Sequence, residues 1–239
     1  MDEKKERIAK TIAAAGACSR RDAERWIAAG RVSVNGQVLA TPACLVGADD
    51  VILVDGRPLN KREAARVWLY HKPPGLVTTH RDPQGRPAVF DHLPPGLPRV
   101  VSVGRLDLSS EGLLVLTNSG ALARQMELPS SRLERVYRVR VHGAVTAEII
   151  GRLRKGVKAD GVHYAPCVAR VEKKQGSHTW LTLTLTEGKN REIRKLMAFF
   201  GLSVARLIRV SYGPFELGDL PRGAVREVSA DLLGEPLCA

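Results

Sequence analysis

The residue best placed for chemistry is an aspartate in a turn before an apolar strand. Asp107 ends the run Gly-Arg-Leu-Asp at 104–107, and a polar turn separates it from the apolar stretch 113–117. A strand of that composition belongs in a core, so the loop that enters it is held rigidly and can position a reacting group. We expect Asp107 to be a nucleophile. Arg105, beside it, is expected to bind a phosphate or to fill the gap left when a group of the substrate is displaced. The alternative is an ordinary turn aspartate, since Asp favours turns and helix starts.

A second motif joins the end of a strand to the start of an amphipathic helix. Residues 186–197 run from an apolar strand through Gly-Lys-Asn into a sequence with helical spacing of its apolar positions. The free N–H groups at a helix start favour anions. We expect the basic residues here to face an anionic partner, although an exposed basic helix face would show the same periodicity. These residues are Lys189, Arg191, Arg194 and Lys195.

An aromatic residue lies on the apolar side of another predicted strand. In 137–142, alternation places Tyr137, Val139 and Val141 on one face and the basic residues on the other. Tyr137 therefore points inward. Such a tyrosine is more often a packed core residue than a catalytic one, and the pattern alone leaves both roles open.

The charge balance points to an anionic partner and excludes several protein classes. The chain of 239 residues has 37 Lys and Arg against 25 Asp and Glu, which gives a net charge of +12 and favours a nucleic acid. No stretch approaches the roughly 20 apolar residues of a membrane span, and the N-terminus is a poor secretion signal, so we expect a cytoplasmic protein. The four cysteines form no C-x-x-C pair, which argues against a zinc site or a disulfide scaffold.

The charge and the turn residues divide the chain in two. Residues 1–60 hold 9 basic and 8 acidic side chains, and the remainder holds 28 and 17. The first part predicts a helix that ends near Gly16, a second helix between a Ser19 cap and Gly30, and a hairpin around Asn35-Gly36. The polar run 56–63 has no apolar periodicity and is the best candidate linker. We therefore expect a small domain at 1–60, a linker at 61–66 and a larger domain at 67–239.

The larger part alternates short apolar runs with helices. Helices are expected near 121–127, 147–155 and 191–200, and strands near 67–70, 76–78, 100–103, 113–117, 137–141, 180–186 and 204–210. This order predicts an α+β domain with a mostly antiparallel mixed sheet and helices on one side. Lys72 precedes a proline-stiffened turn and is a candidate phosphate contact, although a solvated turn lysine is at least as common.

Three motifs together resemble the active site of the pseudouridine synthases that modify bacterial ribosomal RNA. They are Gly-Arg-Leu-Asp at 104–107, Glu-Arg-Val-Tyr at 134–137 and Asn-Arg-Glu-Ile-Arg-Lys at 190–195, within a similarity that runs from about residue 6 to 228. The resemblance implies that Asp107 is the essential nucleophile, that Tyr137 stacks on the target base and takes part in proton transfer, and that Arg194 pairs with the aspartate. It implies isomerisation of uridine to pseudouridine without a cofactor or metal, by a monomer.

The resemblance also indicates which RNA is the partner. The stretches 81–91 and 206–213 resemble the subfamily that acts on large-subunit (23S) rRNA, for which the implied target is uridine 2605, in free rRNA or a partly assembled subunit. The Ser-Arg-Arg and Gly-Arg-Val-Ser-Val-Asn-Gly runs of the first part resemble the alpha-L RNA-binding motif of a ribosomal small-subunit protein. That likeness implies phosphate contacts by Arg20, Arg21, Arg25 and Arg31.

Other functions fit parts of the pattern. A non-catalytic RNA-binding or ribosome-assembly protein would use the same basic residues but would not need Asp107. A synthase acting on small-subunit (16S) rRNA would share the three motifs. A methyltransferase is disfavoured because the chain has no G-x-G-x-x-G loop, and the Gly-Lys-Asn turn lacks the features of a phosphate-binding loop.

Overall fold

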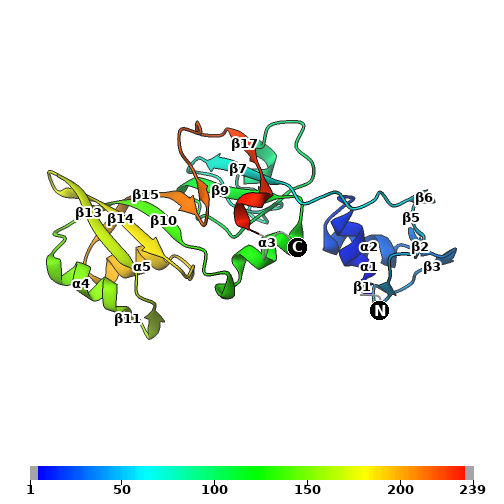
Figure 1. The fold of residues 1–239 in the computed structure, drawn as a ribbon, viewed down its shortest axis with the longest axis horizontal. Coiled ribbons are helices and arrows are strands. Elements are labelled where there is room, and N and C mark those ends of the chain that lie inside the picture. The colour runs from blue at the N-terminus through cyan, green and yellow to red at the C-terminus, as the bar shows by residue number, and fades with distance from the viewer. Residues whose placement is uncertain (1–4, 235–239) are drawn as a thin grey trace. The chain divides into compact units, whose positions relative to one another are not determined.

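The computed structural model describes residues 5–234 in two compact units (Figure 1). One unit contains the residues up to 65 together with 97–101 and 118–120. The other contains 66–96, 102–117 and the residues from 121 onward. Cys238, one of the four cysteines considered above, lies outside the described residues, and Cys18, Cys44 and Cys167 are free thiols.

The first unit has two helices and short strands around one apolar core. The Ser19 hydroxyl accepts a hydrogen bond from the Asp22 amide at 3.0 Å, so the cap read from the sequence starts the second helix. The predicted helices and the Asn35-Gly36 hairpin are confirmed. The helices are α1 (Ile8–Ala14) and α2 (Arg20–Ala28). A two-stranded sheet pairs β1 (Glu6–Arg7) with β4 (Leu45–Val46), and a four-stranded sheet has the order β3 (Gln37–Val38), β2 (Val32–Val34), β5 (Ile52–Val54), β6 (Arg57–Pro58).

The linker prediction for the polar run 56–63 is wrong at its start. Asp55 and Gly56 have φ values of 51° and 75°, and they form a tight turn that returns Arg57–Pro58 to the sheet as β6. Positive φ at two successive residues is the geometry of the favoured hairpin turns, and Asp-Gly satisfies it. The run has no apolar periodicity because β6 is an exposed edge strand, where a proline costs no ladder hydrogen bond.

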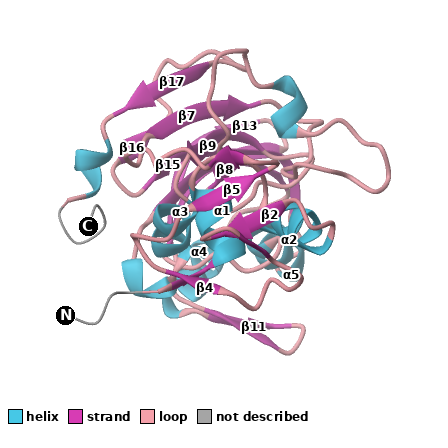
Figure 2. Cartoon of the chain, turned by 90° about the vertical axis from the view of Figure 1, so that its right-hand side faces the viewer, coloured by secondary structure: helices cyan, strands magenta, loops and turns pink. Residues whose placement is uncertain are grey.

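The second unit is built on one long mixed sheet, and its α+β class agrees with the sequence. In it, β15 (Ser203–Tyr212) pairs with β9 (Glu111–Thr117) in parallel, whereas the other long strands pair with their neighbours in antiparallel register. Figure 2 shows β17, β7, β9 and β15 running side by side. The order is β13 (Val168–Gln175), β14 (His178–Leu185), β10 (Arg135–His142), β15 (Ser203–Tyr212), β9 (Glu111–Thr117), β7 (Val67–Lys72), β17 (Val225–Val228), with β16 (Phe215–Glu216) on β15 and β8 (Val101–Ser102) on β9.

Helices and short turns complete this unit. The helices are α3 (Gly120–Glu127), α4 (Ala147–Lys155) and α5 (Glu192–Phe199), within one residue of the predicted positions. A hairpin pairs β11 (Val157–Ala159) with β12 (Val162–Tyr164), and 3-10 turns occur at Val89–His92, Pro129–Ser131 and Ala230–Leu233. The strand predicted at 76–78 is reduced to a single bridge between Val77 and Ala88. The edge strand β13 was missed because charged, exposed residues hide its alternation.

A glycine decides how closely β9 and β15 approach each other. Gly112 has φ of 104°, and a Cβ atom built on it would lie 2.3 Å from the carbonyl oxygen of Arg209. The parallel register pairs these two residues directly. Only glycine accepts both the backbone angle and the contact. Gly112 therefore sets how closely β9, the strand that follows the Asp107 loop, approaches β15.

We predict that Gly112→Ala destabilises the protein by about 3 kcal/mol or more, because it combines an unfavourable φ with a backbone clash. Gly151 in α4 is the matched control. An added Cβ there meets nothing within 4 Å, so Gly151→Ala should be neutral or stabilise the helix by up to about 1 kcal/mol. Urea unfolding of both variants measures the difference, and equal midpoints would contradict the prediction.

Candidate active site

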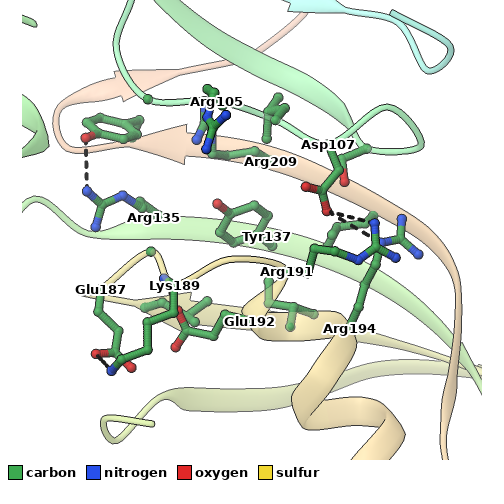
Figure 3. A pocket seen from close by; sticks show the side chains of 18 of the residues that line it. Arg105, Asp107, Arg135, Tyr137, Glu187, Lys189, Arg191, Glu192, Arg194 and Arg209 are labelled. Atoms are coloured by element: carbon green, nitrogen blue, oxygen red, sulfur yellow. Dashed lines mark hydrogen bonds and ion pairs between the residues drawn. The ribbon is translucent and has the colours of Figure 1, made fainter. Parts of the chain in front are cut away.

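A pocket of about 470 Å³ opens in the second unit beside Asp107 (Figure 3). Its walls come from five segments of the chain: the loop 104–110, the end of α3 with the turn after it, the start of β10, the segment from the end of β14 into α5, and β15. Asp107, Tyr137 and Arg194, the three residues assigned from the sequence to the chemistry, all line it. The three motifs therefore meet at one site.

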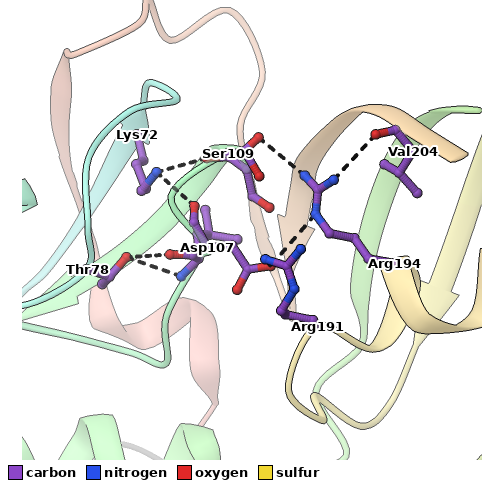
Figure 4. A network of polar contacts seen from close by, with 9 residues as sticks. Lys72, Thr78, Asp107, Ser109, Arg191, Arg194 and Val204 are labelled. Carbon is purple, nitrogen blue, oxygen red and sulfur yellow. Dashed lines mark hydrogen bonds and ion pairs between the residues drawn. The ribbon is translucent and has the colours of Figure 1, made fainter. Parts of the chain in front are cut away.

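The Asp107 loop is fixed by hydrogen bonds to its backbone, which leave the carboxylate available. The Thr78 hydroxyl donates to the Leu106 carbonyl at 2.8 Å, and the Ser110 amide donates to the Asp107 carbonyl at 3.0 Å. The Asp107 side chain remains 29% exposed, on the pocket side of the loop (Figures 3 and 4). The sequence prediction of a rigid loop agrees with this geometry.

Lys72 holds the same loop from behind, and the expectation that it contacts RNA is wrong. Its side chain is fully buried, and Nζ donates to the backbone carbonyls of Pro73, Asp107 and Ser110 at 3.0, 3.2 and 2.9 Å (Figure 4). Burial lowers the pKa of Lys72 to about 8, although the charges of Asp107 and Glu111 act against that shift. The lysine is turned inward because it ends a buried strand, β7, whose neighbour β9 follows the loop.

Two arginines of the α5 region face the carboxylate. Arg191 Nη1 lies 3.7 Å and Arg194 Nε 3.9 Å from Asp107 Oδ2, within ion-pair range but longer than hydrogen bonds. Arg194 is held by the carbonyls of Ser109 and Val204, each at 3.4 Å. Burial lowers the pKa of Arg194, with the charge of Arg191 in the same direction and that of Asp107 opposing it. A guanidinium stays protonated at neutral pH, so both arginines present positive charge to the carboxylate.

Arg191 reaches the carboxylate because of an unusual backbone angle. It precedes α5 with φ of 52°, in the left-handed region, which is uncommon for an arginine and is a form of strain concentrated at functional sites. The sequence assigned Arg191 to RNA and only Arg194 to the aspartate. The structure places both beside Asp107.

Tyr137 lies on the side of β10 that the alternation predicted. Val139 and Val141 are fully buried, and Arg138 points outward to Glu172, with Nη2 at 2.9 Å from the carboxylate. Tyr137 is half-buried, packs against this core and lines the pocket. It is therefore both a core residue and a pocket residue, and the two roles left open by the sequence are compatible.

A pair of carboxyl groups at the pocket was missed by the sequence reading. Glu192 is only 5% exposed, and its Oε2 accepts from the Lys189 amide at 2.9 Å. Glu187 accepts from the Ala165 amide at 2.8 Å and pairs with the Lys189 ammonium. Burial, together with the neighbouring Glu187 charge, raises the pKa of Glu192 to about 7. Both acids lie inside a basic motif, where the sequence pattern drew attention to the cations instead.

Two further arginines, Arg135 and Arg209, line the pocket without having been assigned to it. Arg135 donates to the Thr186 carbonyl and to the Tyr212 hydroxyl, each at 3.0 Å (Figure 3). Arg209 is 2% exposed, and its Nε donates to the Leu113 carbonyl at 2.7 Å. Arg209 lies in the stretch 206–213, which resembles the large-subunit synthases in sequence. The residue was not assigned to the site because alternation along a strand does not show that an arginine is buried.

The remaining basic candidates differ in how exposed their charges are. Arg105 and Lys195 are exposed, and Arg105 lines the pocket. Lys189 is paired with Glu187, as stated above. In the first unit, Arg31 makes a bidentate pair with Asp55 at 2.8 and 2.5 Å and lies over the Trp26 ring. Arg25 pairs with Asp22, whereas Arg20 and Arg21 are exposed on α2.

Residues 5–234 contain no cluster of three or more His, Cys, Asp or Glu side chains that could hold a metal ion. Within the same range, no helix has the length and apolar character needed to cross a membrane.

The site and the fold agree with what comparison with known proteins shows. Residues 66–199 match the RNA pseudouridylate synthase family, and residues 6–52 match the S4 domain. The chain belongs to the RNA pseudouridine synthase family and carries an N-terminal S4 domain. It is an enzyme that isomerises uridine to pseudouridine, and it binds RNA as its substrate.

Individual relatives support this assignment over nearly the whole chain. An uncharacterized RNA pseudouridine synthase of Rickettsia felis is 48% identical over 228 residues, which cover 95% of this chain and 99% of that protein. The ribosomal large subunit pseudouridine synthase B of Pseudomonas aeruginosa is 43% identical, with 96% of this chain and 62% of that protein covered. A crystal structure of a pseudouridylate synthase has the same fold, with a TM-score of 0.66, 24% identity, and coverage of 95% and 97% of the two chains.

We predict that Lys72→Met lowers the stability of the protein by about 2–4 kcal/mol, because three buried backbone carbonyls lose their hydrogen-bond donor. The variant should also lose most of the activity, because the Asp107 loop is no longer held in place. Lys174→Met is the control, since Lys174 is an exposed residue of the edge strand β13. Urea unfolding and pseudouridine formation report the two effects. A Lys72→Met enzyme that resembles the Lys174→Met control in both assays would show that the loop needs no such anchor.

We predict that Glu192→Gln removes a pH dependence of stability. The folded state holds the Glu192 proton up to a pKa of about 7, whereas an unfolded glutamate loses it near 4.5, so stability falls as the pH rises from about 4.5 to 7. Above pH 7 the variant should be more stable than the wild type by roughly 1–3 kcal/mol, since an amide carries no charge to bury. Unfolding midpoints at pH 5, 6, 7 and 8 test this. Glu148→Gln, at an exposed position in α4, should keep the wild-type profile.

Proposed function

We propose that this enzyme modifies ribosomal RNA of the large subunit, with uridine 2605 of 23S rRNA as its target and Asp107 as its nucleophile. The observation that carries the proposal is the convergence of one exposed carboxylate, two guanidinium groups and one tyrosine ring on a single pocket. The choice of RNA is supported by relatives called ribosomal large subunit pseudouridine synthase B, which are 40–43% identical to this chain.

The chemistry requires an ionised carboxylate at the sugar of the target nucleotide. Conversion to pseudouridine breaks the bond between the base nitrogen and the ribose, turns the uracil and rejoins it through a ring carbon. A carboxylate can attack as a covalent nucleophile or act as a base at the ribose. Arg191 and Arg194 lie within ion-pair range of the Asp107 carboxylate. Arg194 is also planar and fixed by two carbonyls, so it orients the carboxylate.

The target base must leave its stack to reach this pocket. Flipping a nucleotide out of its stack costs a few kcal/mol of free energy, and stacking of the flipped base on an aromatic ring offsets part of that cost. Tyr137 lines the pocket together with Asp107 and Arg194, and we assign its ring to stacking and its hydroxyl to proton transfer. Arg105 is exposed at the rim and can occupy the vacated space in the RNA or hold the adjacent phosphate.

RNA affinity comes from both units in this proposal. Arg20 and Arg21 expose their charges on α2 of the S4 domain, where phosphate contacts would add affinity that depends on salt. In the second unit, Lys195 supplies a further exposed cation close to the pocket. Arg25, Arg31 and Lys189 would contribute to RNA binding only by exchanging their carboxylate partners for phosphate.

We predict that Asp107→Asn lowers pseudouridine formation at least about 1,000-fold and leaves RNA binding close to that of the wild type, since an amide has the same shape but cannot act as a nucleophile. The control is Asp160→Asn, a turn residue with φ of 49°, which asparagine accepts readily.

The assay maps pseudouridine in total rRNA from cells that lack the gene and express either variant. Loss of a single 23S site with Asp107→Asn, restored by Asp160→Asn, is the expected result. Loss of a site in 16S rRNA would refute the proposed target alone. Undiminished modification by Asp107→Asn would refute the proposed nucleophile.

A further inference from the structure

Arg209 is a buried cation without a counter-ion in the pocket wall. Its side chain is 2% exposed, Nε is bound to the Leu113 carbonyl, and the guanidinium lies 5.2 Å from the centre of the Tyr212 ring. Its Nη2 is buried and has no hydrogen-bond partner among residues 5–234. No carboxylate of the same residues lies within 4.0 Å of it. An unpaired charge and an unmet donor in one side chain are costly, which indicates an acceptor supplied from outside.

The acids around the pocket do not supply this acceptor. Asp107 faces Arg191 and Arg194, Glu127 accepts from the Gly104 amide at 2.7 Å, and Glu187 and Glu192 are engaged with the Lys189 turn. These are the acidic residues of the lining, which holds more basic side chains than acidic ones. The excess positive charge is therefore built to meet an anionic or strongly accepting group of the substrate.

We propose that Arg209 donates a hydrogen bond to a carbonyl oxygen of the target uracil and stabilises the negative charge that develops there. This assignment rests on the proposed position of the target nucleotide beside Asp107. The Leu113 bond and the Tyr212 ring hold the guanidinium in place, and Arg209 lines the pocket, so a ligand bound there can take the donors that these contacts leave unused. A flat base fits a pocket that also contains Tyr137, whereas a hydrated phosphate tied to the RNA backbone fits the exposed rim at Arg105.

The reaction explains why a cation is needed at this position. When the bond from N1 of uracil to C1′ of ribose breaks, its electron pair stays on the base and spreads onto O2 and O4. The new bond then forms from C5 to C1′, a proton leaves C5 and a proton is gained at N1, so that the product is an isomer. A donor aimed at O2 or O4 stabilises the charged stage more than the starting uridine, which is the requirement for catalysis.

The test combines changes in the enzyme with changes in single atoms of the substrate. Arg209→Lys and Arg209→Gln are compared with Arg138→Lys, an exposed arginine on the outer face of β10. The substrate is the RNA fragment in which the wild type makes pseudouridine, whichever site mapping identifies. It is prepared with uridine, 2-thiouridine or 4-thiouridine at the target, because sulfur is a poor acceptor. Single-turnover rates are followed by nucleoside chromatography, and circular dichroism confirms that each variant is folded.

We expect Arg209→Gln to slow the reaction about 100- to 1,000-fold, and one of the two thio substrates to slow the wild type about tenfold or more. The decisive result is coupling: Arg209→Lys and Arg209→Gln should no longer distinguish that thio substrate from uridine, whereas Arg138→Lys should behave as the wild type. If the Arg209 variants do not fold, the wild-type rates decide, and thio effects below twofold at both positions overturn the inference.

Two outcomes would contradict this inference, and the Asp107→Asn variant separates its failure from that of the proposed nucleophile. Thio effects that persist undiminished in folded Arg209 variants would show that the guanidinium does not contact the base. Coupling of Arg209 to a methylphosphonate at the target phosphate, in place of the thio groups, would assign it to the backbone and overturn the proposal. An inactive Asp107→Asn together with either result leaves the proposed nucleophile intact, so the two failures can be told apart.

Discussion

The site depends on one buried ammonium group, that of Lys72, which donates to two backbone carbonyls of the Asp107 loop and to the carbonyl of Pro73. The loop 104–110, which leads into the core strand β9, leaves carbonyls that no strand pairs, and unpaired carbonyls in a core are unfavourable. Lys72 meets that need from the last position of β7, directly opposite Gly112 in the register. Its cost is the burial of a charge, visible in a pKa lowered to about 8. The result is a loop whose backbone is fixed while the carboxylate of Asp107 remains accessible.

Around this loop the protein gathers positive charge that its own acids do not neutralise. Arg191 and Arg194 arrive from the start of α5, and Arg209 comes from β15 on the other side of the close contact at Gly112. Such an arrangement strains the free enzyme, since like charges are brought together in a partly desolvated pocket. It is compensated when RNA brings phosphates and a uracil that becomes anionic. The electrostatics of the pocket are thus set for the bound and reacting states.

The turn that carries these cations is itself held by acids. Burial raises the pKa of Glu192 to about 7, and this residue accepts from the Lys189 amide, while Glu187 pairs with the Lys189 side chain. A protonated carboxyl can serve as both donor and acceptor in a buried place without adding negative charge. The positive φ of Arg191 follows from this turn and directs its side chain to Asp107. Two acids therefore position two arginines without competing for them.

What the sequence determined is local. The Ser19 cap, the Asn35-Gly36 hairpin, the inward face of Tyr137 and the three helices of the larger part follow from contacts within a few residues, where periodicity and turn chemistry act. The resemblance of three short motifs also identified Asp107, Tyr137 and Arg194 as residues that share one pocket. The sequence did not predict which charged residues are buried. Lys72, Glu192 and Arg209 have the same residue types as solvated surface positions, and nothing near them in the chain shows which neighbours will enclose them. The tertiary structure decides that. The order of β15, β9 and β7 in the sheet brings the carbonyls of Asp107 and Ser110 to Lys72, and that of Leu113 to Arg209, from segments distant in sequence. Glu192 bonds to a near neighbour, the Lys189 amide, but only packing buries it.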